Sequence, residues 1–240
     1  MTLVNYERLS RVYDLDWSDF SPKYDGLIKK IFDENGIEQA KILDLACGTG
    51  VLAEILSKKG HHIRGIDISP QMIEIARKRS IGLPDTVFQV QDMTKFYVND
   101  SFDLITCIFD SINYVLDPSA LRSMFYRVHS TLNKRGFFLF DSNTHREYKK
   151  YHATRLARVL GEERFTQSFT YDWSKRKAAT TFEFLDGAVE VHNQRPYGRT
   201  DLKPLLKKSG FKKVCFLSVT ERRKHEISRG RLICLAQKRG

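Results

Sequence analysis

Apolar runs of strand length alternate with helical patterns through more than half of the chain, and this alternation constrains the fold more than any other feature of the sequence. Five such runs occupy residues 41–46, 62–67, 87–91, 102–109 and 137–140. Nearly continuous apolar strands are typical of a sheet whose two faces are covered by helices. We therefore predict an α/β fold with a doubly wound, mostly parallel sheet.

Polar residues followed by proline mark the starts of three helices, one before the first of these runs and two between later ones. Ser21-Pro22, Ser69-Pro70 and Asp117-Pro118 each combine an N-cap side chain with a proline at the first helical position. Gly36 follows the first of these patterns and predicts its end. The short connections between strands and helices support a repeated β-α-β arrangement.

The pattern changes to antiparallel β structure after residue 150. Residues 180–185 and 188–193 flank Asp186-Gly187, which predicts a β-hairpin with a two-residue loop. In that register Phe182 and Phe184 face valines of the second strand and form an apolar side. The opposite side then carries Glu183, Glu190, His192 and Gln194.

The hairpin belongs to a segment that interrupts the α/β pattern. We interpret residues 145–198 as an antiparallel β insertion that covers the carboxyl edge of the sheet and acts as a substrate lid. Residues 1–144 and 199–240 are then expected to form the core. A helix and two strands complete that core: residues 202–209, 213–219 and 232–236.

The composition fits a globular chain. With 240 residues the chain can bury a full core. It has no apolar run of about 18 residues and no apolar signal-peptide region, so we expect a cytoplasmic protein with no membrane contact. Four cysteines lie far apart in apolar stretches, which predicts buried, reduced thiols and no structural metal. They are Cys47, Cys107, Cys215 and Cys234.

Charge is distributed unevenly. Residues 121–240 contain 27 of the 40 Lys and Arg residues but 11 of the 29 Asp and Glu residues. A basic half is compatible with an anionic partner, such as nucleic acid or a phosphorylated small molecule. Because the charges occur in short clusters typical of turns and helix ends, we interpret most of them as solvated surface.

A glycine-rich turn follows the first predicted strand at residues 44–50, Asp-Leu-Ala-Cys-Gly-Thr-Gly. Such a turn lets a ligand approach the backbone, and the next helix directs N–H groups at it. Residues 48–53 also satisfy G-x-G-x-x-A, so a nicotinamide or flavin dinucleotide is a competing ligand. A pyrophosphate would be repelled by Asp44, whereas S-adenosylmethionine has no phosphate and carries an ammonium and a sulfonium. The charge of Asp44 therefore favours S-adenosylmethionine.

Acidic or amide side chains also follow the next two strands. Asp67 ends the second strand, where a carboxylate can accept both ribose hydroxyls. Gln91-Asp92-Met93 follows the third, where a carboxylate or amide can bind the adenine amino group and a methionine can pack on the ring. Because open α/β sheets bind ligands at the carboxyl ends of their strands, we predict one nucleoside site here.

Four stretches, in this order, resemble the motifs of class I S-adenosylmethionine-dependent methyltransferases. They are the turn at 44–50, I-D-I-S-P-Q-M-I-E-I-A-R from Ile66, Q-D-M from Gln91, and F-D-L-I-T-C from Phe102. The resemblance implies a Rossmann-like seven-stranded sheet in the order 3-2-1-4-5-7-6, with the last strand antiparallel to its neighbours. It implies S-adenosylmethionine as the cofactor of a direct, in-line methyl transfer. The cofactor-binding residues are then expected to be Tyr13, Tyr24, Asp44, Ala46, Cys47, Gly48, Gly50, Asp67, Ile68, Met72, Gln91, Asp92, Met93, Ile108 and Asp110.

Segments outside these motifs are similar to a bacterial subgroup of that family. The subgroup contains small-molecule methyltransferases and the N-methyltransferases of nucleotide-linked amino sugars. The similarity implies that Tyr13 and Tyr24 contact the methionine end of the cofactor and that Asn113-Tyr114 border the methyl group. The similar segments are Tyr13-Asp14 and residues 109–114, 140–144 and 190–197.

Two residues of the insertion are candidates for substrate chemistry. His192 would act as a base toward an ammonium or hydroxyl acceptor, or would instead be paired with Glu183 or Glu190. Arg195 would clamp a substrate phosphate or carboxylate, or would tie the insertion to the core. Cys47 is not expected to be a nucleophile, because small residues suffice in the glycine turn.

Three functional classes follow. We favour a methyltransferase acting on nitrogen or oxygen of a small molecule, because the insertion would enclose a pocket. An RNA or DNA methyltransferase is the alternative suggested by the basic half. However, residues 109–114 lack the Asn/Asp-Pro-Pro-aromatic tetrad that is typical of enzymes that methylate exocyclic amines of bases. A non-catalytic, cofactor-binding regulatory protein is the third class. The sequence does not determine the oligomeric state.

Overall fold

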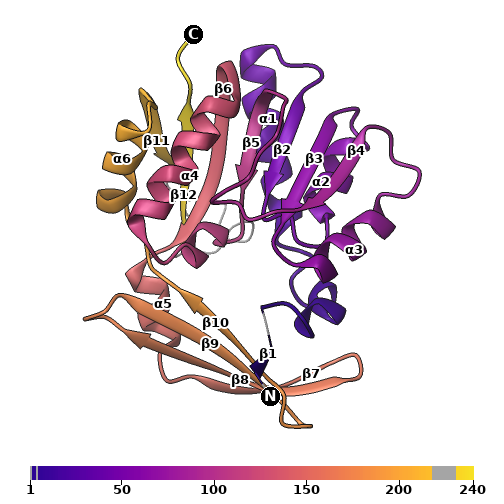
Figure 1. Cartoon of the computed structure of the whole chain (residues 1–240), viewed down its shortest axis with the longest axis vertical. Coiled ribbons are helices and arrows are strands. Elements are labelled where there is room, and N and C mark those ends of the chain that lie inside the picture. Colours follow the sequence, from indigo (N-terminus) through magenta and orange to yellow (C-terminus); the bar gives the residue numbers. More distant parts are fainter. Residues whose placement is uncertain (1, 4, 218–230) are drawn as a thin grey trace.

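A computed structural model describes residues 2–3, 5–217 and 231–240 (Figure 1). Its larger sheet has seven strands, and numbering the core strands along the chain gives the order 3-2-1-4-5-7-6, as predicted. In spatial order the strands are β4 (Thr86–Val90), β3 (His62–Asp67), β2 (Lys41–Leu45), β5 (Phe102–Cys107), β6 (Leu132–Asn143), β12 (Arg231–Gln237) and β11 (Lys213–Leu217). Residues 218 and 219 of the predicted strand at 213–219 lie outside the described residues.

The sheet is parallel except at β12, which runs antiparallel to both β6 and β11. Helices cover both faces, which confirms the doubly wound architecture. One apolar cluster joins the sheet to α4 and α6, and the other joins it to α1, α2 and α3. These helices are α1 (Asp25–Asn35), α2 (Val51–Ser57), α3 (Pro70–Arg79), α4 (Pro118–Thr131) and α6 (Arg199–Lys208).

The predicted helix starts are largely correct. The side chain of Ser69 accepts a hydrogen bond from an N–H group in the first turn of α3, and Asp117 does the same for α4. Gly36 ends α1 with a left-handed φ of 64°. Ser21-Pro22 begins a short 3₁₀ helix, η3 (Ser21–Tyr24), that leads into α1 rather than α1 itself.

A second, five-stranded sheet faces the carboxyl ends of the parallel strands, at the bottom of Figure 1. Four of its strands form an antiparallel meander, while β1 adds in parallel at the edge of β10. A short helix, α5 (His145–Tyr151), leads from β6 into this sheet. In spatial order the strands are β1 (Thr2–Leu3), β10 (Val189–Gln194), β9 (Lys177–Phe184), β8 (Glu163–Asp172) and β7 (Arg155–Leu160).

The register of the β9–β10 hairpin differs by one residue from the predicted register, which was wrong. Glu190 pairs with Phe182, so the loop has three residues, 185–187. Gly187, at φ 83°, supplies the left-handed residue that closes a three-residue loop. Because side chains alternate along a strand, this slip moves the polar set to the other face. That buried face carries Phe182, Phe184, Glu190, His192 and Gln194.

Two further observations concern the surface and the thiols. No helix in the described part of the chain is long and apolar enough to cross a membrane. All four cysteines are free, but the expectation that all are buried was wrong, because Cys215 is exposed on the edge strand β11.

Candidate active site

A cavity of about 410 Å³ lies at the carboxyl ends of β2, β3, β4 and β5. We call it the first cavity. Its volume falls within the range of ligand pockets, about 300–1,000 Å³. Most of the residues predicted to bind the cofactor line it: Tyr13, Asp44, Ala46, Cys47, Gly48, Asp67, Ile68, Met72, Gln91, Asp92, Met93 and Ile108.

The glycine turn forms the floor of the first cavity. Ala46, Gly48 and Gly50 all have positive φ, at 55°, 54° and 78°. Gly50 does not line the cavity, and its role is one of packing. A Cβ there would lie 3.0 Å from the Cβ of Ala76 and 3.1 Å from the ring of Phe88. A Cβ on Gly48 would meet nothing within 4 Å, so the backbone there is open to a ligand.

Asp67 braces this turn from the end of β3. Its two carboxylate oxygens accept hydrogen bonds from the N–H groups of Gly48 and Ser69, each at 2.9 Å. Burial raises the pKa of Asp67, and the backbone hydrogen bonds act against that shift. Asp67 therefore holds the turn in shape while it also lines the first cavity.

Asp44 is a buried acid without a cationic partner among the described residues. Its carboxylate accepts a hydrogen bond of 2.6 Å from the Thr106 hydroxyl, and its side chain lines the first cavity. Burial and the nearby charge of Asp67 raise the pKa of Asp44 to about 7, against the opposing effect of the Thr106 hydrogen bond. A cation in this cavity would relieve the cost of ionising Asp44.

The loop after β4 supplies the next wall. Asp92 accepts hydrogen bonds of 2.8 Å from both the N–H and the hydroxyl of Thr94. The side-chain amide of Gln91 is engaged within the loop, where it accepts from the N–H of Tyr97 at 2.9 Å. Asp92 therefore has free acceptor capacity, whereas Gln91 serves mainly to shape the loop.

The N-terminal segment covers the first cavity. Tyr13 stacks on Trp17 with ring centroids 5.4 Å apart, and both rings line the cavity. Asp14 fixes this segment to the glycine turn, because it accepts a hydrogen bond of 2.6 Å from Thr49 and forms an ion pair with Arg79. Tyr6 and Trp17 line the site but were not predicted, since no motif distinguishes them in the sequence.

A second cavity of about 450 Å³ lies between the two sheets. The ends of β5 and β6 and the inner faces of β8, β9 and β10 line it, together with the N-terminal segment. His192 and Asp110 line this second cavity rather than the first. Five aromatic residues line both cavities and form their junction: Tyr6, Tyr13, Trp17, Phe109 and Tyr114.

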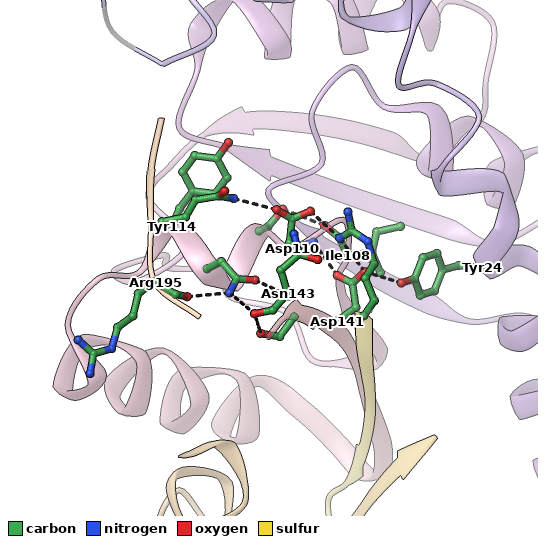
Figure 2. A network of polar contacts seen from close by, with 12 residues as sticks. Tyr24, Ile108, Asp110, Tyr114, Asp141, Asn143 and Arg195 are labelled. Atoms are coloured by element: carbon green, nitrogen blue, oxygen red, sulfur yellow. Dashed lines mark hydrogen bonds and ion pairs between the residues drawn. The ribbon is translucent and has the colours of Figure 1, made fainter. Parts of the chain in front are cut away.

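Figure 2 shows the polar network at the base of the second cavity. Tyr24 lies outside both cavities and donates a hydrogen bond of 2.5 Å to Asp141, so the structure gives it a role in the core rather than at the ligand. Asp110 accepts a hydrogen bond of 2.8 Å from Gln194 and pairs with Arg231. Arg231 also reaches Asp141 at 3.2 Å, so two buried acids share one guanidinium.

Asn113 and Arg195 also differ from their predicted roles. Asn113 is fully buried and donates to the carbonyl oxygens of Arg195 and Asn143, at 2.7 and 2.9 Å. It accepts from the N–H of Asn143 at 2.9 Å and thus links β6 to the end of β10. The guanidinium of Arg195 lines neither cavity and points away from the network in Figure 2. Arg195 joins this network through its backbone N–H and carbonyl oxygen, which bond to Asn113, and not through its charged side chain.

The lining of the first cavity fits S-adenosylmethionine rather than a dinucleotide. It includes three aspartates, Asp44, Asp67 and Asp92, and among the described residues that line it there is no Lys, Arg or His. A pyrophosphate would find no cation there, whereas an ammonium and a sulfonium would be attracted. The predicted preference for S-adenosylmethionine over a dinucleotide is therefore supported by three acidic residues, where the sequence argument used Asp44 alone.

Comparisons with known proteins agree with this chemistry. The sequence profile of the methyltransferase domain matches residues 42–136. A putative methyltransferase from Geobacillus sp. (strain WCH70) is 35% identical over 174 residues, which cover 71% of this chain and 68% of that protein. A crystal structure of an S-adenosylmethionine-dependent methyltransferase from Clostridium acetobutylicum ATCC 824 superposes with a TM-score of 0.76 at 25% identity, over 98% of this chain and 96% of the other.

The sugar N-methyltransferase KedS8 from Streptoalloteichus sp. ATCC 53650 shares the fold, with a TM-score of 0.73 at 18% identity over 98% and 93% of the two chains. With the strand order, the acidic cofactor cavity and these relatives in agreement, the chain belongs to the class I S-adenosylmethionine-dependent methyltransferases.

Proposed function

We propose that this methyltransferase acts on a nitrogen or oxygen atom of a small molecule bound in the second cavity. The observation that carries this proposal is the junction of the two cavities. Five aromatic residues line both of them, so a ligand in each would meet at the same group of rings. Residues 145–198 would act as the substrate lid, because β8, β9 and β10 form the far wall of the second cavity.

The cofactor, when bound, supplies a methyl group on a sulfonium. A lone pair of the acceptor attacks that methyl carbon in line, and the thioether is the leaving group. The chain contributes alignment and exclusion of water, which together can lower the barrier of such a reaction substantially. Tyr13, Phe109 and Tyr114 present rings at the junction, and aromatic faces attract a cation through their quadrupoles. Asp44 and Asp67 would orient the cationic nucleoside through charge and hydrogen bonding.

The shape of the second cavity favours a small molecule. It lies between two sheets, and its wall includes side chains from both of them. Its charged residues are of both signs, Asp110, Glu147, Arg158 and Arg231, so it suits a polar acceptor. Both guanidiniums already have acidic partners, Arg231 with Asp110 and Asp141 and Arg158 with Asp16, so an anionic acceptor would have to compete with a carboxylate for either of them. Amino sugars linked to nucleotides are the first acceptors to test, given the fold shared with KedS8.

The experiment supplies labelled-methyl S-adenosylmethionine in parallel to three mixtures: nucleotide-linked amino sugars, a metabolite extract and total RNA. We expect label in small molecules. Label in RNA alone would replace this proposal with a nucleic-acid methyltransferase. Cofactor binding without transfer to any mixture would favour a non-catalytic regulatory protein.

Asp67→Ala tests whether the first cavity binds S-adenosylmethionine. It removes the acceptor that braces Gly48 and lines the cavity, so calorimetry should show that affinity for S-adenosylmethionine falls by at least about tenfold, since one charge-assisted hydrogen bond is worth about 1.5–3 kcal/mol. Asp33→Ala on α1, where the side chain is 61% exposed, is the control and should leave the affinity unchanged. Equal affinity in both variants would refute the role of Asp67.

A further inference from the structure

Four side chains from three segments form a continuous series of hydrogen bonds beside the junction of the cavities. The hydroxyls of Tyr6 and Tyr114 are 2.7 Å apart. The Tyr114 hydroxyl lies 2.9 Å from Nδ1 of His192. Nε2 of His192 lies 3.2 Å from a carboxylate oxygen of Glu190. The chain thus runs from a buried carboxylate in β10 to the aromatic rings that line both cavities.

The protonation pattern of this chain follows from Glu190, which is fully buried. Its carboxylate accepts hydrogen bonds from the backbone N–H groups of Arg8, Leu9 and Tyr6, at 2.5, 2.9 and 3.1 Å. Burial raises the pKa of Glu190, but the hydrogen bonds from His192, Leu9 and Arg8 outweigh it and hold the pKa below its ordinary value. Glu190 is therefore ionised and accepts the proton of Nε2.

The direction of the remaining hydrogen bonds is then fixed. When His192 carries a single proton, on the Nε2 that faces Glu190, its Nδ1 can only accept, so the Tyr114 hydroxyl donates to it. The Tyr114 oxygen in turn accepts from the Tyr6 hydroxyl. The Tyr6 oxygen is left with free lone pairs at the junction of the two cavities, where the acceptor atom would lie in the proposed function.

Tyr6 is also held in an unusual backbone conformation. Its φ is 63°, a region that residues other than glycine adopt only when the surroundings impose it. Here its own N–H is bonded to Glu190, and its ring packs edge-on against His192 with centroids 4.7 Å apart. The Glu190 carboxylate therefore positions both Tyr6 and His192, the first and third side chains of this series of hydrogen bonds.

We propose that Tyr6, Tyr114 and His192 form a proton relay that receives the proton lost by the methylated acceptor. The proposal rests on the proposed function. The bond between the acceptor atom and the methyl carbon forms while the bond between methyl carbon and sulfur breaks, and sulfur keeps that electron pair. The N–H or O–H proton of the acceptor passes to the Tyr6 oxygen, the Tyr6 proton to Tyr114, and the Tyr114 proton to Nδ1 of His192. Both tyrosines end neutral.

Within the relay, Tyr6 alone touches the acceptor, and His192 and Glu190 act through it. Glu190 stabilises the imidazolium and sets its tautomer, as the carboxylate does in a Ser-His-Asp triad. His192 later returns the proton to water. The groups that face His192 are Glu190 on β10, Tyr114 in the 3₁₀ helix η4 (Ser111–Tyr114), the rings of Tyr6 and Phe182, and, across the second cavity, Asp110 and Arg231.

A test that needs no acceptor uses the ¹⁵N-histidine-labelled full chain with S-adenosylhomocysteine. Nuclear magnetic resonance should show the Nε2–H tautomer for His192. Tyr114→Phe removes the hydrogen bond to Nδ1 and should change the ¹⁵N shift of that nitrogen, whereas Glu190→Gln removes the carboxylate that faces Nε2 and should change the shift of Nε2. A Nδ1–H tautomer, or ¹⁵N shifts of His192 that neither variant changes, would overturn the relay.

The catalytic test follows methyl transfer to an acceptor identified in the parallel mixtures. Tyr6→Phe and His192→Gln should lower kcat by about 10²–10⁴, as expected for loss of general-base catalysis, with cofactor affinity unchanged. The kcat of the parent should fall at low pH, where the imidazole can no longer take up a proton, and this fall should be absent from His192→Gln. Tyr126→Phe, on the exposed side of α4, is the control for removing a hydroxyl.

A His192→Gln protein with the parent's rate and pH profile would refute the relay. If the parent protein methylates no acceptor, the proposed function fails instead, and the magnetic resonance result still decides whether the hydrogen bonds have the direction that the relay requires.

Discussion

Asp44→Asn tests whether the first cavity is built around an acid that awaits a cation. In the fold the pKa of Asp44 is raised from 3.8 to about 7, chiefly by burial. The unfolded chain would release this proton near its ordinary value, so unfolding releases a proton between about pH 4 and pH 7. The stability of the parent protein therefore falls as pH rises through that window.

The size of the effect follows from the same two values. Each tenfold change in proton affinity is worth about 1.4 kcal/mol, so ionising Asp44 in the fold costs up to about 4 kcal/mol relative to the unfolded chain. The neutral amide introduced by Asp44→Asn would carry no such cost and could still accept the Thr106 hydrogen bond. The free energy of unfolding of the variant, relative to the parent, should therefore increase by up to about 4 kcal/mol between pH 4 and pH 8.

The assay is urea denaturation of both proteins at several pH values without cofactor. Asp33→Asn, which changes an exposed side chain on α1, is the control and should differ from the parent by less than about 0.5 kcal/mol at every pH. Adding S-adenosylmethionine at pH 8 should stabilise the parent more than the variant, because the ionised acid meets a cation. A stability difference that does not change with pH would show that Asp44 is not the buried, unpaired acid described above.

Two further substitutions probe how the first cavity is supported. Gly65→Ala should lower the free energy of unfolding by about 1–3 kcal/mol in urea, because its Cβ would lie 2.5 Å from the Phe88 ring and 2.9 Å from Cys47 Sγ; Gly26→Ala, with nothing within 4 Å, should not lower it, and equal losses would refute the packing argument. Asp14→Ala should weaken S-adenosylmethionine binding by about fivefold in calorimetry, since one hydrogen bond is worth about 1 kcal/mol, and unchanged affinity would show that the N-terminal cover does not contribute.

The sequence predicted the parallel core well because local and long-range preferences agree there. Apolar strands, Ser-Pro and Asp-Pro helix starts and a left-handed glycine at the end of α1 all point to the same arrangement. The acids at the strand ends were placed for the same reason, since parallel strands bring their carboxyl ends to one edge. Asp44 and Asp67 therefore line one cavity, although 23 positions separate them in sequence.

The second cavity was harder to predict. Asp186-Gly187 is a signal for two- and three-residue loops alike, and the choice between them inverts which face of β10 is buried. That inversion places Glu190 and His192 on the same buried face as Phe182 and Phe184, and not on the face opposite them. Tyr6 and Arg231 reach the site from the two ends of the chain, so no local pattern could have paired them with it.

Arg195 shows a different limit. The sequence left two roles open for Arg195, a clamp for a substrate anion or a tie between the insertion and the core, and its contacts fit a tie made by its backbone. The side chain of Asn113 donates to its carbonyl oxygen, and its N–H donates to the carbonyl oxygen of Asn113, both at 2.7 Å. The backbone hydrogen bonds of Arg195 therefore determine its role more than its side-chain type does, and sequence patterns do not reveal such backbone contacts.

The parallel pairing of β1 with β10 ties the start of the chain to the insertion, while Asp14, a dozen residues later, is tied to the glycine turn. Residues 5 to 14 thus form a short strap between two parts of the molecule, and this strap also walls both cavities. In the proposed function the acceptor enters beneath the insertion, so a displacement of the insertion would also pull on residues that line the first cavity. We therefore expect a bound acceptor to change the affinity for S-adenosylmethionine, which calorimetry with and without the acceptor would measure.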